Sequence, residues 1–481
     1  MVLTSIEFII FFVIITVFYF ILPFRFRIGF LLLASYYFYS TYKIESLILL
    51  IILTFFNFLT GLLIGKENNT TRKKIILILS LFSNIFVLCW FKYVDIKTFV
   101  RFILPNYGIP NQLPSLEKIL PVGLSFYTFK IMNYTIDVYR SRIMPEKKFS
   151  IFALYVSFFP QLISGPIDRA TTLLPQFYKN HTFDYKGITD GMKLILWGLF
   201  QKIVIADNLA VIVDPVFNNP ARYEGISLII ATLFFTFQIF CDFSGYTDIA
   251  IGTAQILGFS SMKNFDRPYF AQSIPEFWRR WHISLTSWFR DYLYIPLGGN
   301  RVSNYRRYFN VMIVFLLSGL WHGSTWTFAI WGAIHGFYYL ISIITQPTRN
   351  KIAHLCNIQK FPNLHKLWKI FVTFSLVSFA WIFFRANSFS DAIYIISHLF
   401  SGWKADLNSM TFLLSSKFEF LVSCSSIVFL VIIQYIQRYG SIREGLMKKP
   451  IWLRWMIYYF AIVSILLLGN FGMKDFIYFK F

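Results

Sequence analysis

Two of the seven histidines stand where an imidazole could take part in acid–base chemistry. His322 lies in the apolar stretch Phe315–Trp326, with Gly319 and Gly323 on either side. An ionisable group inside an apolar span is costly, so function is the first hypothesis for it. Burial keeps the imidazole neutral, with a lone pair that can accept a proton, and glycine lets a substrate or another backbone approach closely. A buried histidine bonded to a neighbouring helix would give the same pattern, so packing remains the alternative.

The second histidine, His282, lies in the stretch Phe277–Trp288, which is rich in tryptophan and arginine. If this stretch is one helix, Trp278 and His282 share a face. Tryptophan beside arginine is typical of a membrane–water interface, but the same residues suit a site that stacks an adenine ring and pairs with phosphates. The residues we expect to contact substrate are Trp278, Arg279, Arg280, Trp281, Ser284, Arg290 and Trp321.

The other polar residues in apolar stretches have simpler interpretations. His335 falls inside a long apolar span, where hydrogen bonding within or between helices is the favoured role. Asp242 and Asp248 lie in the stretch Cys241–Asp248, and we expect them to brace a buried chamber by pairing with arginine or backbone N–H groups. The remaining four histidines, which lie in connectors or at the end of a late apolar stretch, receive no role.

The elements that must position these residues are membrane helices. Of the 481 residues, 56% are hydrophobic and only 14% are charged, and the mean hydropathy is +0.57. Soluble globular chains carry about 25% charged residues. The net charge of +22 comes from Lys and Arg in short connectors between apolar stretches, which follows the positive-inside rule and argues against nucleic-acid binding. The four cysteines have no metal-ligand spacing, so we expect neither a disulfide nor a metal site, and no cofactor.

A helix needs about 20 apolar residues to cross the hydrocarbon core. Candidate spans cover residues 6–23, 28–42, 46–64, 75–93, 118–137, 190–206, 224–241, 244–258, 311–320, 326–345, 368–384, 412–436 and 452–470. The pieces at 28–42, 151–165, 244–258 and 311–320 are too short to cross and predict broken or re-entrant helices. Irregular backbone at membrane depth must be buried in protein or line a wet cavity. The sequence therefore predicts an all-α polytopic membrane protein whose middle encloses a chamber.

The distribution of basic residues predicts an orientation. Basic connectors at 25–27, 66–74, 140–148, 263–307, 349–369 and 438–454 are placed on the cytoplasmic side. The N-terminus and the C-terminus then both lie outside. We expect a single membrane domain over residues 1–481, with N-terminal helices at about 1–117, a motif-bearing core at about 118–386, and C-terminal helices with an aromatic tail at 387–481.

Ordered motifs along roughly 350 residues resemble the membrane-bound O-acyltransferase family, in its bacterial branch of alginate and peptidoglycan O-acetylation proteins. The motifs are the stretches 121–129, 136–140, 159–169, 198–207, 241–248, 277–288, 291–301, 319–323 and 380–386. The family's invariant histidine matches His322, and the histidine of its second motif matches His282. The resemblance implies a ring of transmembrane and re-entrant helices around a thinned centre with a tunnel.

The resemblance also implies an activity. An acetyl group would pass from cytoplasmic acetyl-CoA, with His322 as the base for the incoming hydroxyl. His282, Ser284 or backbone N–H groups would orient the thioester and stabilise the oxyanion, and arginines including Arg279, Arg280 and Arg290 would receive the phosphates. The implied acceptor is a cell-envelope polysaccharide reached through a periplasmic or extracellular esterase-like transferase with a serine nucleophile (SGNH type). The expected location is the bacterial cytoplasmic (inner) membrane, in contact with lipid.

The C-terminal end, Phe471–Phe481, is aromatic instead of polar. It resembles the aromatic motif of a short partner peptide in lipoteichoic acid D-alanylation, whose tyrosine is thought to receive the acyl group. Tyr478 is therefore a candidate acyl carrier, and an aromatic interfacial anchor is the alternative. Two other functions stay open: an acyltransferase that takes its acyl group from an acyl-carrier protein, and a transporter. The sequence shows no paired halves, which inverted-repeat transporters have.

Overall fold

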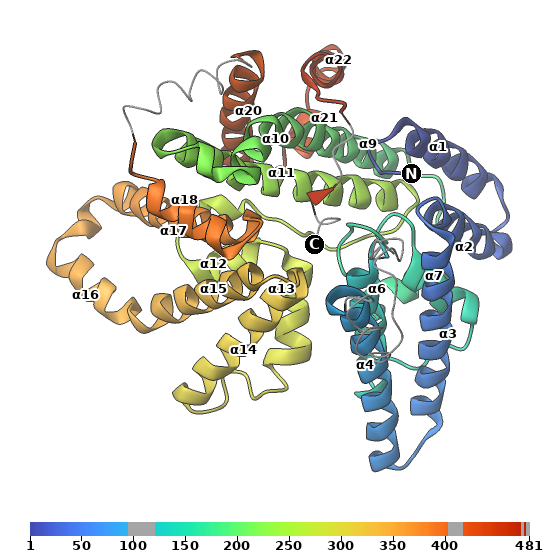
Figure 1. Cartoon of the computed structure of the whole chain (residues 1–481). Helices are drawn as coiled ribbons and strands as arrows, with labels where there is room; N and C mark the ends of the chain where they lie inside the picture. Colours follow the sequence, from blue (N-terminus) through green and yellow to red (C-terminus); the bar gives the residue numbers. More distant parts are fainter. Residues whose placement is uncertain (95–120, 403–416, 473–475, 478–481) are drawn as a thin grey trace, which may run out of the picture. The chain divides into compact units, whose positions relative to one another are not determined.

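The computed structural model describes residues 1–94, 121–402, 417–472 and 476–477, and their regular secondary structure is entirely helical (Figure 1). Among these residues, eight helices are long and apolar enough to cross a membrane. The prediction of an all-α, multi-pass membrane protein is therefore confirmed. By the clustering of its internal contacts, the chain forms two compact units, and the helices α9 and α11 each run from one unit into the other.

The first unit comprises residues Met1–Gly191 and Ala250–Met262. Its helices are α1 (Ile6–Ile21), α2 (Phe24–Ser40), α3 (Ile44–Lys66), α4 (Thr70–Tyr93), α6 (Leu124–Tyr139), α7 (Phe149–Ser157) and α8 (Ala170–Leu173), with the 3₁₀ turn η1 (Leu174–Tyr178).

Polar side chains tie the helices of the first unit together from inside. Asn57 of α3 and Asn84 of α4 exchange side-chain hydrogen bonds of 2.8 and 3.3 Å. Lys130 of α6 lies 3.3 Å from the amide oxygen of Gln161, whose amide nitrogen donates to Asp168 at 2.6 Å. Buried polar groups between membrane helices need such partners, because lipid offers none.

The second unit comprises residues Met192–Ile249 and Lys263–Phe481. Its helices are α9 (Tyr185–Leu199), α10 (Asp207–Asn218), α11 (Gly225–Ile256), α12 (Ile274–Arg280), α13 (Ile283–Phe289), α14 (Asn304–His322), α15 (Trp326–Ile344), α16 (Gln346–Leu355), α17 (Pro362–Arg385), α18 (Phe389–His398), α20 (Lys417–Ile436), α21 (Ile442–Met447) and α22 (Ile451–Leu468). Two π-helical turns, η2 (Phe200–Ala206) and η5 (Arg290–Tyr294), and the 3₁₀ turns η3 (Pro220–Arg222), η4 (Pro268–Phe270) and η6 (Ile358–Lys360) complete it.

The helices α14 and α15 form a tightly packed hairpin in the second unit (Figure 1). A Cβ atom added at Gly319 would overlap the carbonyl oxygen of Phe328, and one added at Gly332 would overlap that of Phe315. Two backbones can approach this closely only where both lack side chains at the crossing. The expectation that glycine beside His322 admits another backbone is thus confirmed for Gly319.

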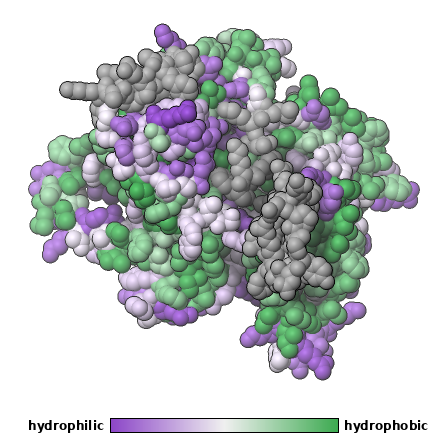
Figure 2. Space-filling view, in the orientation of Figure 1, coloured by the Kyte–Doolittle hydropathy of each residue, from purple (hydrophilic) through white to green (hydrophobic). Residues whose placement is uncertain are grey.

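Large hydrophobic side chains remain exposed along many helices, as expected for surfaces that face lipid. In the most apolar segment of α4 only 11% of the residues are buried inside the protein, and the same is true of α22. Figure 2 shows hydrophobic surface along the α3–α4 hairpin and hydrophilic residues at its tip, where the basic connector 66–74 lies.

Three span predictions differ from the structure. The stretches 224–241 and 244–258 are one continuous 32-residue helix, α11, instead of two pieces. The stretch 311–320 belongs to the 19-residue α14, which begins at Asn304. The stretch 190–206 runs on through the π turn η2 into α10 without a break. In each case polar or glycine residues that suggested an end are accommodated by close helix packing or buried partners.

Candidate active site

His322 occupies the last position of α14, and Gly323 follows it in extended conformation. Its side chain lies in an aromatic box, with ring centroids 4.8 Å from Trp321, 5.0 Å from Trp331 and 5.3 Å from Phe384. His322 is only 4% exposed. The C-terminal end of a helix carries a partial negative charge that favours a nearby cation, and aromatic faces also attract cations. The site can therefore stabilise the imidazolium that forms when His322 takes a proton.

His282 reaches the same aromatic layer from a different element. Its ring centroid lies 6.4 Å from Trp321, the residue that also contacts His322, and 4.7 Å from Phe243 of α11. The structure thus brings together the two histidines that the sequence separates by 40 positions, with Trp321 in contact with both.

Trp278 and His282 do not lie on one helix, so the condition under which they would share a face is not met. The helix α12 ends at Arg280, Trp281 is extended, and His282 has a φ of 43°, so α13 begins only at Ile283. A left-handed conformation is unfavourable for a residue with a Cβ, and such strain persists only where surrounding contacts fix it. The break redirects the chain at His282, and no glycine or proline in the sequence announces it.

The contacts that fix His282 come from Asn264, a residue that sequence reasoning missed. The Oδ1 atom of Asn264 lies 3.1 Å from His282 Nδ1, and it accepts from the Ser284 backbone N–H at 3.2 Å and the Ser284 hydroxyl at 2.9 Å. The backbone N–H of His282's neighbour Ile283 also donates to the Asn264 carbonyl oxygen, at 2.8 Å. Asn264 stands in a polar connector after α11, where its residue type alone gives no signal.

This network assigns the tautomer of His282. Because Asn264 Oδ1 accepts, His282 Nδ1 carries the proton and Nε2 carries the lone pair. His282 is 1% exposed, and burial lowers its pKa to about 3, so the ring is neutral at physiological pH. In this arrangement Nε2 is an acceptor. It can orient a hydroxyl group but cannot itself donate a hydrogen bond to an oxyanion.

The expected hydrogen bonding of His335 is not found. His335 of α15 is fully buried, and within the described part of the chain neither ring nitrogen has a hydrogen-bond partner. Aromatic rings surround it instead, with Trp278 at 4.9 Å and Trp331 at 5.0 Å between centroids. Trp331 contacts His335 and His322, which places His335 directly behind the candidate site.

The three tryptophans predicted to contact substrate are packed inside the protein, and Trp321 is 8% exposed. Trp278 is 7% exposed and Trp281 is 1% exposed. Trp281 stacks on Phe277 with centroids 5.5 Å apart and contacts Trp381 at 5.0 Å. An adenine ring would have to compete with these protein rings for the faces of Trp281.

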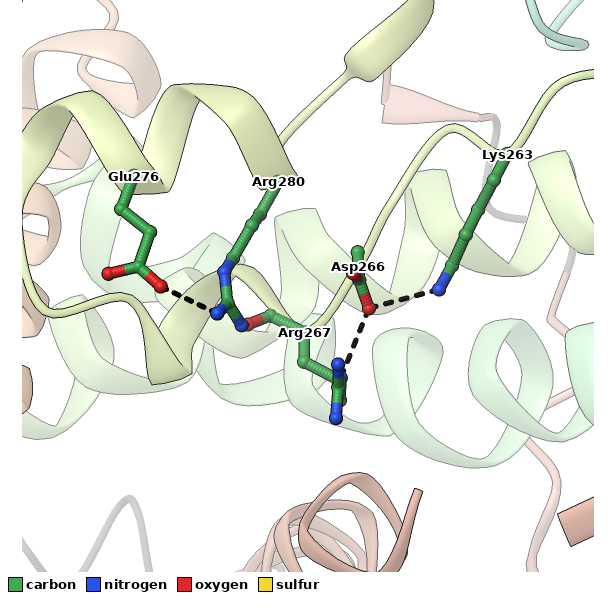
Figure 3. A network of polar contacts seen from close by, with 5 residues as sticks. All are labelled: Lys263, Asp266, Arg267, Glu276 and Arg280. Carbon is green, nitrogen blue, oxygen red and sulfur yellow. Dashed lines mark hydrogen bonds and ion pairs between the residues drawn. The ribbon is translucent and has the colours of Figure 1, made fainter. Parts of the chain in front are cut away.

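The predicted phosphate-binding arginines differ in how much of their charge is already engaged. Arg280 donates to Glu276 at 2.5 Å, and the neighbouring Lys263 and Arg267 both pair with Asp266 (Figure 3). Arg290 is exposed and pairs with Asp291 at 2.8 Å, whereas Arg279 is exposed and has no ion pair to any described acid. Arg279 is therefore the member whose charge is most available to an anionic ligand.

The expected partners of the two intramembrane aspartates, arginine or backbone N–H groups, are found only for Asp242, in one backbone N–H. Asp242 pairs with Lys202 at 2.6 Å and accepts the backbone N–H of Ile477 at 2.7 Å. Asp248 accepts from the Gln201 amide at 2.8 Å. Lys202 also pairs with Asp207 at 2.7 Å. Tyr478, the predicted acyl carrier, lies outside the described residues.

Comparison with known proteins identifies the family of the chain. The sequence profile of the membrane-bound O-acyltransferase family matches residues 31–387, which include both histidines. A probable alginate O-acetylase of Azotobacter vinelandii is 38% identical over 396 residues, or 81% of this chain and 76% of that protein. A peptidoglycan O-acetyltransferase of Helicobacter pylori is 36% identical over 76% of this chain and 72% of that protein. A teichoic acid D-alanyltransferase of Streptococcus thermophilus is 29% identical over 57% of this chain and 70% of that protein. Because the family match covers most of its length, the chain belongs to the membrane-bound O-acyltransferase family.

Proposed function

We propose that this protein is an O-acetyltransferase of the bacterial cytoplasmic membrane that moves acetyl groups from cytoplasmic acetyl-CoA toward a cell-envelope polysaccharide. The observation that carries the proposal is the meeting of His322 and His282 at Trp321, inside a buried aromatic layer. Relatives named for O-acetylation of alginate and peptidoglycan support acetyl as the group and an alginate-like polymer or peptidoglycan as the acceptor. Acetyl-CoA serves as a substrate, and the proposal requires no bound cofactor.

The acetyl donor needs no further activation, because a thioester is already reactive. The main catalytic requirement is a base for the acceptor hydroxyl. His322 takes the proton of the incoming hydroxyl while its oxygen attacks the thioester carbonyl carbon. The tetrahedral intermediate then collapses, the C–S bond breaks, and the CoA thiolate recovers the proton from the imidazolium. The product is an oxygen ester and free CoA. The end of α14 and the rings around His322 favour its charged form during this interval.

The roles of the neighbouring residues follow from their geometry. His282, with its lone pair on Nε2, orients the attacking hydroxyl, and Asn264 holds the imidazole in that tautomer. Stabilisation of the oxyanion falls to N–H or O–H donors near His322, among which buried tryptophan indoles are candidates. Arg279 offers an exposed positive charge to the CoA phosphates, and Arg280 and Arg290 can join it by exchanging their present acidic partners.

Tyr478 completes the proposed relay as a transient acyl carrier. Its phenol would be the first acceptor, forming an acetyl–tyrosyl ester. The serine hydroxyl of a periplasmic or extracellular esterase-like partner would then attack this ester, releasing the tyrosine. Support comes from the preceding residues Phe476 and Ile477, which are buried at 0% and 7% exposure.

The test is acetyl transfer from radiolabelled acetyl-CoA to the purified protein in detergent. Wild type should release CoA and gain label, His322→Ala should lose both, and Tyr478→Phe should lose the label. His354→Gln, at an exposed position on α16, is the matched histidine control and should behave like wild type. CoA release that survives His322→Ala would overturn the assignment of the base. Label that survives Tyr478→Phe would keep the acetyltransferase and reject the tyrosine carrier.

A second donor is favoured by one relative, the teichoic acid D-alanyltransferase. In that alternative an acyl-carrier protein docks on the basic cytoplasmic face and delivers the acyl group. The same assay separates the two, because a charged acyl-carrier protein would label the protein where acetyl-CoA does not. Absence of label from both donors, in folded protein, would direct attention to a missing partner or to transport.

A further inference from the structure

The π-helical turn η2 in the second unit leaves a backbone carbonyl oxygen that accepts a hydrogen bond from another segment of the chain. In η2 the N–H of Asp207 donates to the carbonyl oxygen of Lys202, five residues earlier. In an α-helix the same N–H would donate to Ile203. The carbonyl oxygen of Ile203 instead accepts the N–H of Asn470 at 3.1 Å. Single π turns inside helices are frequently found at functional sites.

η2 and the first turn of α10 contact the chain at two more points just beyond α22. The side chain of Asn208 donates to the carbonyl oxygen of Leu468 at 2.8 Å. Gly469 lies against Ile203, and an added Cβ would come within 2.7 Å of the Ile203 side chain. Residues 468–470 are thus held by one hydrogen bond and one close approach to Ile203 of η2, and by one hydrogen bond from Asn208 of α10.

A second anchor lies at the end of the described chain. The Ile477 N–H donates to Asp242 Oδ2 at 2.7 Å, and Asp242 Oδ1 lies 2.6 Å from Lys202 Nζ. Lys202, itself part of η2, also pairs with Asp207. Buried charges in a membrane protein are costly and are kept where they pair and serve a function. Here the charged group holds a backbone N–H from 235 residues away.

The seated segment touches the candidate site through one aromatic layer. The ring of Phe476 lies 4.5 Å from Tyr246 and 5.7 Å from Phe243. Phe243 in turn contacts His282 at 4.7 Å. Phe476 therefore supports the ring against which His282 is packed.

We propose that η2 and the Asp242–Lys202 pair form a socket for the chain's own C-terminal segment, and that the seated segment positions His282 through Phe476 and Phe243. Asp242 is a positioning residue in this arrangement, since it acts through the segment and not on substrate. The effect on acetyl transfer rests on the proposed function. The docking of the segment on η2 and Asp242 does not, because it is a property of the fold.

The sharpest variant is Ile477→Pro, which removes the N–H that Asp242 accepts. Proline has no N–H to donate. The matched control is Phe471→Pro, which places proline in the same segment at a residue that is 57% exposed and whose N–H makes no hydrogen bond within the described residues. Both variants are compared with wild type by hydrogen–deuterium exchange of the C-terminal peptide, by thermal unfolding, and by acetyl transfer.

Wild type and Phe471→Pro should show slow exchange in the C-terminal peptide, and Ile477→Pro should show exchange at least tenfold faster with an unchanged melting temperature. The kcat of Ile477→Pro should fall about tenfold or more while the KM for acetyl-CoA stays the same. Equally fast exchange in wild type would overturn the socket. Released segment with unchanged kcat would overturn the positioning role. An inactive wild type would reject the proposed function while exchange still tests the socket.

Discussion

At the scale of single residues, His282 provides the clearest pH prediction. Burial lowers its pKa to about 3, from an ordinary value of 6.5. The unfolded chain therefore binds the proton more readily between these two values, so this histidine favours folding fully above pH 6.5 and progressively less as the pH falls toward 3. His282→Gln, which stays neutral, should make thermal stability less sensitive to acid over this interval. A melting-temperature series between pH 5 and 8 measures the difference.

The same pKa predicts a negative result for catalysis. Because His282 is neutral throughout the range from pH 5 to 9, its titration cannot shape the rate profile there. His282→Gln should lower kcat and leave the shape of the pH–rate curve as in wild type. A pH–rate curve whose shape differs from that of wild type would show that His282 is the titrating base and would reverse the roles given to the two histidines.

Asn264 supplies the second prediction at this scale. Its Oδ1 serves His282 and both donors of Ser284. Asn264→Ala leaves these buried groups without their acceptor, which typically costs about 1–3 kcal/mol. We expect kcat to fall about tenfold to a hundredfold, since about 1.4 kcal/mol corresponds to a factor of ten. Asn264→Asp keeps the acceptor and should recover part of the rate, and equal loss in both variants would contradict an orienting role.

Some residues of the candidate site could be predicted from the sequence, and others could not. His322 and His282 could be selected because an ionisable group in an apolar stretch is costly, and the structure brings them to the same tryptophan. Asn264 could not be selected, because placing an asparagine in a polar connector carries no free-energy cost that would indicate a function. His335 was assigned hydrogen bonds that the described residues do not provide, since sequence does not show that aromatic rings surround it.

At the scale of elements, the α14–α15 hairpin holds His322 in place. A side chain at Gly332 would press on the carbonyl oxygen of Phe315 and force the two helices apart. Overpacking of this kind costs about 1–3 kcal/mol, so Gly332→Ala should lower the melting temperature and reduce kcat through displacement of His322. Gly29→Ala is the matched control, because no atom lies within 4 Å of its added Cβ. Unchanged activity in Gly332→Ala would show that the crossing does not set the position of His322.

Elements also explain the failed helix boundaries. Polar residues around Gly245 predicted a break, yet α11 is continuous because Gly245 lies close to Gly198 and Asp242 is paired with Lys202. Conversely, the break at His282 was not predicted, because nothing in the local residue types requires a positive φ there. Long apolar stretches identify helices reliably. Whether a glycine or an acidic residue inside such a stretch interrupts the helix depends on which residues of a neighbouring helix pack against it.

At the scale of the whole molecule, the membrane character followed from composition and eight helices confirm it, while the orientation remains a prediction. The positive-inside rule places the connector at residues 349–369 in the cytoplasm, and that connector carries the exposed Cys356. A membrane-impermeant maleimide should therefore leave Cys356 unlabelled in spheroplasts and label it in inverted vesicles. Cys89 and Cys424 are replaced by alanine, so that Cys356 is the accessible thiol.

The matched control places a cysteine in the connector on the opposite side. Lys43 is exposed between α2 and α3. The structure extends the predicted stretch 28–42 to the 17-residue α2, which is long enough to cross. Because the connectors at 25–27 and 66–74 are both placed in the cytoplasm, the rule puts Lys43 outside. With Cys356 also replaced, Lys43→Cys should be labelled in spheroplasts and protected in inverted vesicles. Labelling of both thiols from one side would mean that a segment between them crosses the membrane differently from the prediction. Labelling of each thiol from the side opposite to the prediction would mean that the whole molecule has the inverse orientation. Arg279, Arg280 and Arg290 would then lie outside, away from cytoplasmic acetyl-CoA, and the orientation would no longer support that donor.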